Sequence, residues 1–179
     1  MRTIARALLA PIAIAASIVA VAAPLPAAAQ VLKFHAVLDG KSGPEPTGSA
    51  ATGTATVSVD MATKKVSVDL DVTGITIDDL WDKLVAAPIG PIHFHKYATA
   101  GAGDSVLALP LPFGTSYLPT AKGLHVTMTD YDYVAGAALL KSTLSFEDFV
   151  AAMKGGLIVL NIHTDKFNPG EISGTVVAG

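Results

Sequence analysis

The chain has 179 residues, contains no cysteine and carries a formal net charge of −3. The lack of cysteine excludes disulfides, thiolate chemistry and every cysteine-ligated metal centre. A mildly acidic chain without a cluster of basic residues lacks the positively charged patch that binds nucleic acid. We therefore expect no nucleic-acid partner.

Residues 1–29 have the pattern of a secretory signal peptide. Arg2 and Arg6 supply a positive start, residues 7–23 form an alanine-rich apolar run, and an alanine triplet precedes the expected cleavage point. A membrane anchor is the alternative, but prolines break the run and no basic flank follows it. We expect a secreted or periplasmic protein whose mature domain, residues 30–179, has a net charge of −5 and no membrane span.

Alternation of apolar and polar residues dominates the chain after the expected cleavage point. It is cleanest in residues 52–60 and 65–72, and the four residues between these segments predict an antiparallel hairpin. Strands are also predicted at residues 31–38, 91–97, 105–109, 123–129, 156–164 and 171–177, with a turn at 166–170 joining the last two. Seven or eight short strands, each with one solvent-exposed face and one apolar face, predict an all-β sandwich or barrel.

Two short helices are expected at the rim of this sheet. Thr76 is predicted to cap a helix at residues 77–86, and Ser145 to cap a helix at residues 146–154. Residues 109–122, rich in proline and glycine, are predicted to form a loop without regular structure. Such a loop either shapes a binding surface or is a mobile surface loop that binds no ligand.

Two histidines stand two residues apart in the segment Pro-Ile-His-Phe-His-Lys. On a strand, the side chains of His93 and His95 point the same way with Cα atoms about 6.5 to 7 Å apart, so both imidazoles can bind one ion. Copper or zinc needs at least one more ligand, and the candidates are His163, His125 and His35. Alternatively, these histidines hydrogen-bond to neighbouring polar groups or form a pH-sensitive patch.

Templates for catalysis are scarce in this chain. It has no glycine-rich phosphate loop, no Gly-x-Ser-x-Gly elbow and no His-Glu-x-x-His helix. Residues 130–133, Asp-Tyr-Asp-Tyr, are interpreted either as a solvated turn or as an exposed loop suited to contact with a partner. The sequence assigns no catalytic residue and favours a protein that is not an enzyme.

Three short motifs follow one another in an order that resembles the CHRD domain, the module named after chordin and found in many secreted bacterial proteins. They are His93-Phe94-His95, Asn161-Ile162-His163-Thr164 and Gly170-Glu171-Ile172-Ser173-Gly174. The resemblance covers residues 31–177. It implies an immunoglobulin-like β-barrel. The scarcity of catalytic residues favours a secreted binding or structural module of the cell envelope, with an envelope or extracellular partner. In this chain, Ser173 stands where the family usually has arginine, and Phe94 where it usually has isoleucine.

The histidines also resemble the copper ligands of copper/zinc superoxide dismutase, which is another β-sandwich. By that similarity the metal set would be His93, His95, His163 and His125, and the alternative function would be copper or zinc binding. The mature chain lacks arginine and a recognisable zinc loop, so a working dismutase is not expected. Convergence of His163 or His125 on the pair would favour a metal site.

Overall fold

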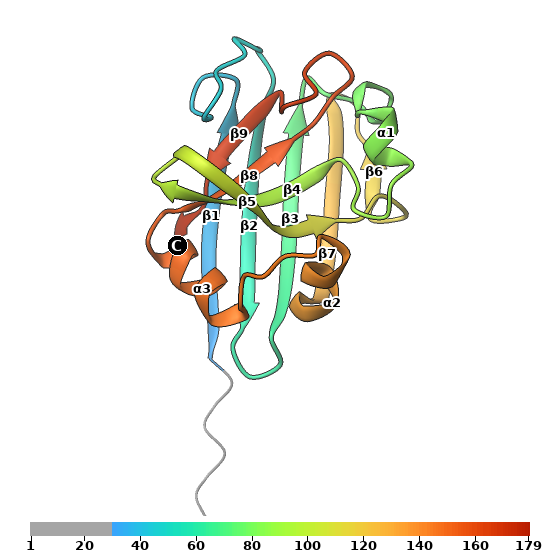
Figure 1. Cartoon of the computed structure of the whole chain (residues 1–179). Coiled ribbons are helices and arrows are strands. Elements are labelled where there is room, and N and C mark those ends of the chain that lie inside the picture. Colours follow the sequence, from blue (N-terminus) through green and yellow to red (C-terminus); the bar gives the residue numbers. More distant parts are fainter. Residues whose placement is uncertain (1–29) are drawn as a thin grey trace, which may run out of the picture.

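The computed structural model describes residues 30–179, which form one continuous antiparallel sheet (Figure 1). Its strand order is β5-β4-β8-β9-β1-β2-β3-β7-β6, and β10 pairs with β1. The strands are β1 (Val31–Asp39), β2 (Thr52–Asp60), β3 (Lys65–Thr73), β4 (Ile92–Thr99), β5 (Ala102–Leu111), β6 (Tyr117–Pro119), β7 (Gly123–Asp132), β8 (Ile158–Ile162), β9 (Ile172–Thr175) and β10 (Val177–Ala178). The predicted all-β antiparallel fold is confirmed.

The described residues hold ten strands, which is more than the seven or eight predicted. The two extra strands, β6 and β10, have three and two residues, too few for an alternating pattern to appear in the sequence. Both predicted hairpins are present, as β2–β3 and β8–β9. Residues 1–29, where the signal peptide is predicted, lie outside the described part of the chain.

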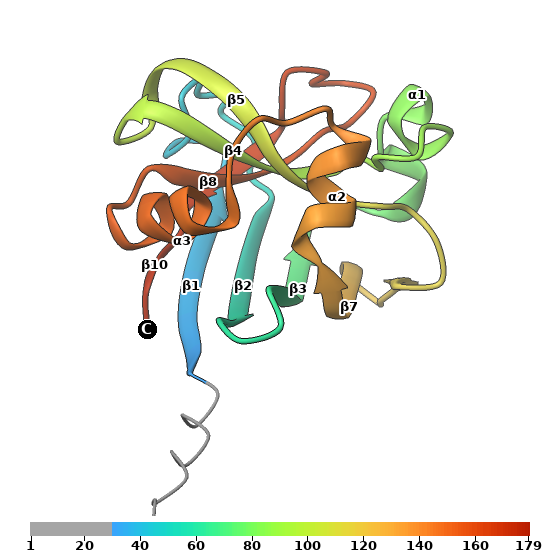
Figure 2. The ribbon, with the colours of Figure 1, turned by 60° about the horizontal axis from the view of Figure 1, so that its bottom comes forward.

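The sheet curls on itself, so that β5, β4 and β8 cross in front of β1, β2, β3 and β7 (Figures 1 and 2). The two halves of the sheet meet where β9 lies beside β1. This junction is narrow, since β1 and β9 share the single pair Asp39 and Ser173. The apolar residues of the alternating strands point into the space between the two halves and form the core. Its members include Phe34, Leu38, Val57, Val68, Leu70, Phe94, Leu109, Val126, Leu160 and Ile162.

The predicted second helix is confirmed as α3 (Phe146–Lys154). The Ser145 side chain accepts a hydrogen bond from the backbone N–H of Asp148, and Gly155 ends the helix. Phe149 is fully buried and packs edge to face on Phe94 of β4, with ring centroids 6.1 Å apart. The helix therefore closes one open side of the curled sheet, as Figure 2 shows.

The predicted helix at residues 77–86 is wrong as a single element. The chain forms a 3-10 turn, η1 (Ile77–Asp79), and a separate one-turn helix, α1 (Asp82–Val85). Leu80 between them is extended, fully buried and bridged to Thr164, so a tertiary contact overrides the local helical pattern. At the start of the 3-10 turn, the backbone N–H and hydroxyl of Thr76 both donate to the Asp79 carboxylate, so Asp79 holds this end of the turn in place of the predicted Thr76 side-chain cap.

Two segments predicted to be loops contain regular structure. In residues 109–122, Tyr117 of β6 is buried and its hydroxyl donates to the Leu111 carbonyl oxygen at 2.7 Å. The Asp-Tyr-Asp-Tyr segment is the end of β7 and the start of a third helix, α2 (Tyr133–Leu139), in which Tyr133 is buried. The interpretation of residues 130–133 as an exposed contact loop or solvated turn is therefore wrong.

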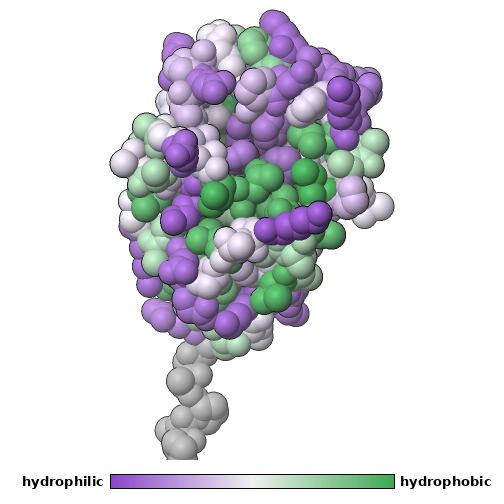
Figure 3. All heavy atoms as spheres, in the orientation of Figure 1, coloured by the Kyte–Doolittle hydropathy of each residue, from purple (hydrophilic) through white to green (hydrophobic). Residues whose placement is uncertain are grey.

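The loops that follow β1 and β8 gather with α1 at one end of the molecule, at the top of Figure 1. In the same orientation, Figure 3 shows this end as mostly hydrophilic, whereas hydrophobic residues gather across the middle of the face. Among residues 30–179, no helix is both long and apolar enough to cross a membrane.

Replacing Phe149 by alanine should lower the free energy of unfolding by about 3–5 kcal/mol, because it removes a buried ring and leaves a cavity against Phe94 and Tyr133. Val134→Ala, on the exposed side of α2, is the control and should change stability by less than about 0.5 kcal/mol. Urea denaturation followed by circular dichroism measures both. Equal effects of the two changes would mean that α3 does not close the core.

Candidate metal centre

Three histidines from two adjacent strands meet on one face of the sheet. His93 and His95 lie on β4, and antiparallel pairing sets His93 opposite Asn161 of β8. His163 follows two residues later, and its backbone N–H donates to the Pro91 carbonyl oxygen at 2.9 Å. Because side chains alternate along a strand, this register places the third imidazole on the same face as the other two.

The imidazole rings converge closely. The ring centroids of His93 and His163 are 5.1 Å apart, those of His95 and His163 are 5.9 Å apart, and those of His93 and His95 are 6.0 Å apart. One nitrogen of each ring lies within 4.8 Å of a nitrogen of both others. A single ion bonded to all three nitrogens at about 2.0 to 2.1 Å would separate them by no more than twice that bond length, so small ring rotations suffice.

The donor atoms of this group lack hydrogen-bond partners. His93 is 2% exposed, and both of its ring nitrogens are buried without a partner, as are Nε2 of His95 and Nε2 of His163. Buried polar atoms in folded proteins are nearly always paired, and leaving one unpaired costs about 1–3 kcal/mol. A group of orphaned nitrogens aimed at one point is the pattern expected of metal ligands.

One further contact fixes the tautomer of His163. Its Nδ1 lies 2.7 Å from the carbonyl oxygen of Asn168. A carbonyl oxygen can only accept, so Nδ1 carries the proton and Nε2 keeps its lone pair. Ligating histidines typically donate their other ring N–H to such a carbonyl, which sets the orientation of the ring.

The electrostatics of the group keep all three rings neutral. Burial lowers the pKa of His93 from 6.5 to about 3, with further lowering from the neighbouring His163 and His95. Burial and the proximity of His163 lower the pKa of His95 to about 4, and burial lowers the pKa of His163. Lone pairs are therefore available near pH 7.

The Gly-Glu-Ile-x-Gly and Asn-x-His-Thr motifs hold the loop that positions His163. A side chain at Gly170, which has a φ of +136°, would collide with Asn161, whose amide Nδ2 donates to the Pro169 carbonyl oxygen. The Glu171 carboxylate accepts hydrogen bonds from the hydroxyls of Ser49 and Thr164. These contacts fasten the loop after β8 to the loop after β1.

Gly174 serves the fold at the seam of the sheet. A Cβ there would collide with the Val37 backbone, since β9 approaches β1 closely at this point. Ser173, beside it, is buried and donates to the Asn161 side-chain oxygen at 3.1 Å. The motif residues Asn161, Thr164, Gly170, Glu171 and Gly174 are thus structural neighbours of the histidine group, and the Glu171 carboxylate is not part of that group.

The other two candidate histidines lie elsewhere. His125 on β7 forms a separate group with Asp69 and Asp71, and its ring nitrogens already contact Asp71 at 2.8 Å and Thr127 at 2.7 Å. Four strands separate β7 from β8 in the sheet order. His35 is exposed on β1. The structure brings together three of the four histidines named by the superoxide dismutase similarity and does not bring in His125.

A family model for the CHRD domain matches residues 34–176. The chain belongs to the CHRD domain family. No curated protein and no solved structure matches it. Membership and the β-fold support a binding or structural module, and the histidine group of this CHRD domain is the feature from which a ligand can be argued.

Sequence reasoning missed two residues that support the group. The first is Asn168, whose carbonyl orients His163, although the Asn-Pro-Gly sequence did predict a turn there. The second is Trp81, whose ring centroid lies 6.5 Å from that of His163 and whose backbone N–H donates to the His163 carbonyl oxygen. No local pattern relates residue 81 to residue 163, so only the tertiary fold reveals this contact.

The metal-free protein should lose stability as the pH falls from about 6.5 toward 4. Above pH 6.5 the imidazoles are neutral in both the folded and the unfolded chain, whereas below it only the unfolded chain takes up protons readily. His93→Leu should therefore flatten the dependence of the urea midpoint on pH, measured between pH 7 and 4.5 with a chelator present. His35→Leu, at an exposed histidine, should keep the wild-type dependence; an unchanged slope in His93→Leu would contradict the pKa assignment.

Proposed function

We propose that the protein is an exported CHRD-domain module that binds one copper or zinc ion through His93, His95 and His163. The observation that carries this proposal is the convergence of three buried, neutral imidazoles whose inward nitrogens have no hydrogen-bond partner. An ion would satisfy these nitrogens together. The alternative, in which the histidines hydrogen-bond to neighbouring polar groups, explains the group less well, because it leaves Nε2 of His95 and Nε2 of His163 unpaired.

The chemistry of the donor set favours copper or zinc over other ions. Imidazole nitrogen suits Zn²⁺, Cu²⁺, Ni²⁺ and Fe²⁺, whereas Mg²⁺ and Ca²⁺ prefer oxygen. The usual order of affinity places Cu²⁺ above Zn²⁺ for a given nitrogen site. The proposal assigns ion binding and no catalytic step, and it leaves His125 outside the metal set.

The module is proposed to act in the cell envelope or outside the cell. This rests on the signal-peptide pattern of residues 1–29 and on the secreted context of the family that the sequence resembles. An envelope or extracellular partner remains part of the proposal, with the segment 109–122 as the predicted contact. Burial of Tyr117 leaves Leu118, which is 53% exposed, as an apolar side chain of that segment available to a partner.

Titration of the purified protein with Cu(II) should show about one equivalent bound, and replacing His93 and His95 by alanine should abolish it. Trp81 is the only tryptophan in the chain and lies beside His163, so bound Cu(II) should quench its fluorescence. Zn(II) should compete for the same site and, because it binds more weakly, restore the emission only in large excess. Isothermal calorimetry and fluorescence measure these effects.

His125→Ala is the matched control for this titration, because it removes a histidine that is not in the group. It should bind one equivalent with wild-type affinity. Circular dichroism checks that the double variant is folded. Wild-type uptake by a folded His93→Ala, His95→Ala variant would overturn the metal site.

Expression of the full chain in a bacterial host should yield a mature protein that begins at Gln30. Mass spectrometry of the periplasmic and medium fractions would detect a loss corresponding to residues 1–29. Replacing Arg2 and Arg6 by glutamate should leave the precursor uncleaved, because it reverses the charge of the n-region. Recovery of the intact precursor from wild-type cells would contradict export by this signal.

A further inference from the structure

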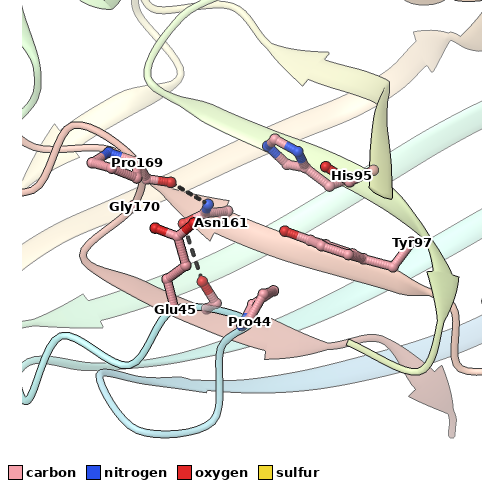
Figure 4. A pocket seen from close by; sticks show the side chains of 9 residues that line it. Pro44, Glu45, His95, Tyr97, Asn161, Pro169 and Gly170 are labelled. Atoms are coloured by element: carbon pink, nitrogen blue, oxygen red, sulfur yellow. Dashed lines mark hydrogen bonds between the residues drawn. The ribbon is translucent and has the colours of Figure 1, made fainter. Parts of the chain in front are cut away.

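A pocket opens beside His95, between the β4–β5 hairpin and the loops after β1 and β8. Its volume is about 170 Å³, well above the roughly 10–15 Å³ that one water needs. Figure 4 shows His95 and Tyr97 pointing from one side toward Asn161, Glu45 and Pro169 on the other. Its lining includes Glu45, His95, Tyr97, Ser105 and Asn161.

The pocket meets the histidine group at its least buried member. His93 and His163 are 2% and 7% exposed and do not line the pocket, whereas His95 is half-buried and does. Within residues 30–179, the group offers three ligand atoms. Metal sites with three protein ligands keep a further position for water or a small molecule.

We infer that this pocket leads to the remaining coordination position of the ion and admits a small neutral nitrogen ligand of the imidazole class. The inference rests on the proposed metal site. It adds the ligand, the route by which the ligand enters, and the residues that select it. A metal ion sealed among three histidines would not need such a route.

The polarity of the pocket favours a neutral ligand over an anion. None of the lining residues is lysine or arginine, and Glu45 places a carboxylate at the rim. The Asn161 side chain is already engaged by the Pro169 carbonyl and the Ser173 hydroxyl. An imidazole can bind the metal through one nitrogen while its other N–H faces an acceptor such as Glu45 or the Tyr97 hydroxyl.

The test uses the Cu(II)-loaded protein and electron paramagnetic resonance. Addition of imidazole should change the nitrogen hyperfine pattern while copper stays bound, which reports a fourth nitrogen ligand. Ser105→Trp should still bind one equivalent of copper and should lower the affinity for imidazole at least about tenfold, because the indole fills the pocket from the exposed edge strand β5.

Val106→Trp is the matched control, since it adds the same bulk to the neighbouring position, whose side chain points to the opposite face of the strand. It should bind imidazole like the wild type. Wild-type imidazole affinity in Ser105→Trp, or removal of copper by imidazole without a bound intermediate, would overturn the pocket as the ligand route. Failure of the wild type to bind copper would instead overturn the proposed metal site.

Glu45→Gln tests the selection of the ligand. Removing the rim carboxylate should shift the ratio of azide to imidazole affinity toward azide by about two- to fivefold, the range expected for an exposed charge. Glu147→Gln, which removes a carboxylate of α3 that is paired with Lys64, should leave the ratio unchanged. Equal ratios in the wild type and in Glu45→Gln would exclude Glu45 as the selecting residue.

Discussion

The pairing of β4 with β8 is the constraint on which the candidate site depends. Its register puts His93 opposite Asn161 and Phe94 opposite Leu160, so one face of the pair carries the histidines and the other carries the core. A slip of one residue would turn the imidazoles into the core and the phenyl ring outward. The burial of Phe94 and Leu160 therefore fixes the position of the three candidate metal ligands as firmly as it fixes the fold.

The motifs that mark the family act mainly on this geometry. Gly170 allows the Asn161 amide to contact the loop, and Glu171 joins the loops after β1 and β8 through two hydroxyls. The loop in turn presents the Asn168 carbonyl that orients His163. Thus residues outside the histidine group determine whether the third imidazole faces the other two.

The parts of the fold that follow from local alternation could be predicted from sequence, and so could the shared face of His93 and His95. The parts decided by distant contacts could not. The helix predicted at residues 77–86 breaks because Leu80 bridges Thr164, and Tyr133 is buried because its ring packs against Phe146 of α3. The exclusion of His125 likewise needed the strand order, which alternation within a single strand does not encode.

If the proposed ion binds, burial of the histidines has opposite effects on the metal-free and metal-bound forms of the protein. In the metal-free protein it leaves nitrogens unpaired and destabilises the fold, and it keeps the pKa of His93 near 3 and that of His95 near 4. For an incoming ion, the same lowered pKa values remove competition from protons down to mildly acidic pH, where exposed histidines become protonated. The proposed site therefore combines a less stable fold with ligands that stay unprotonated at mildly acidic pH.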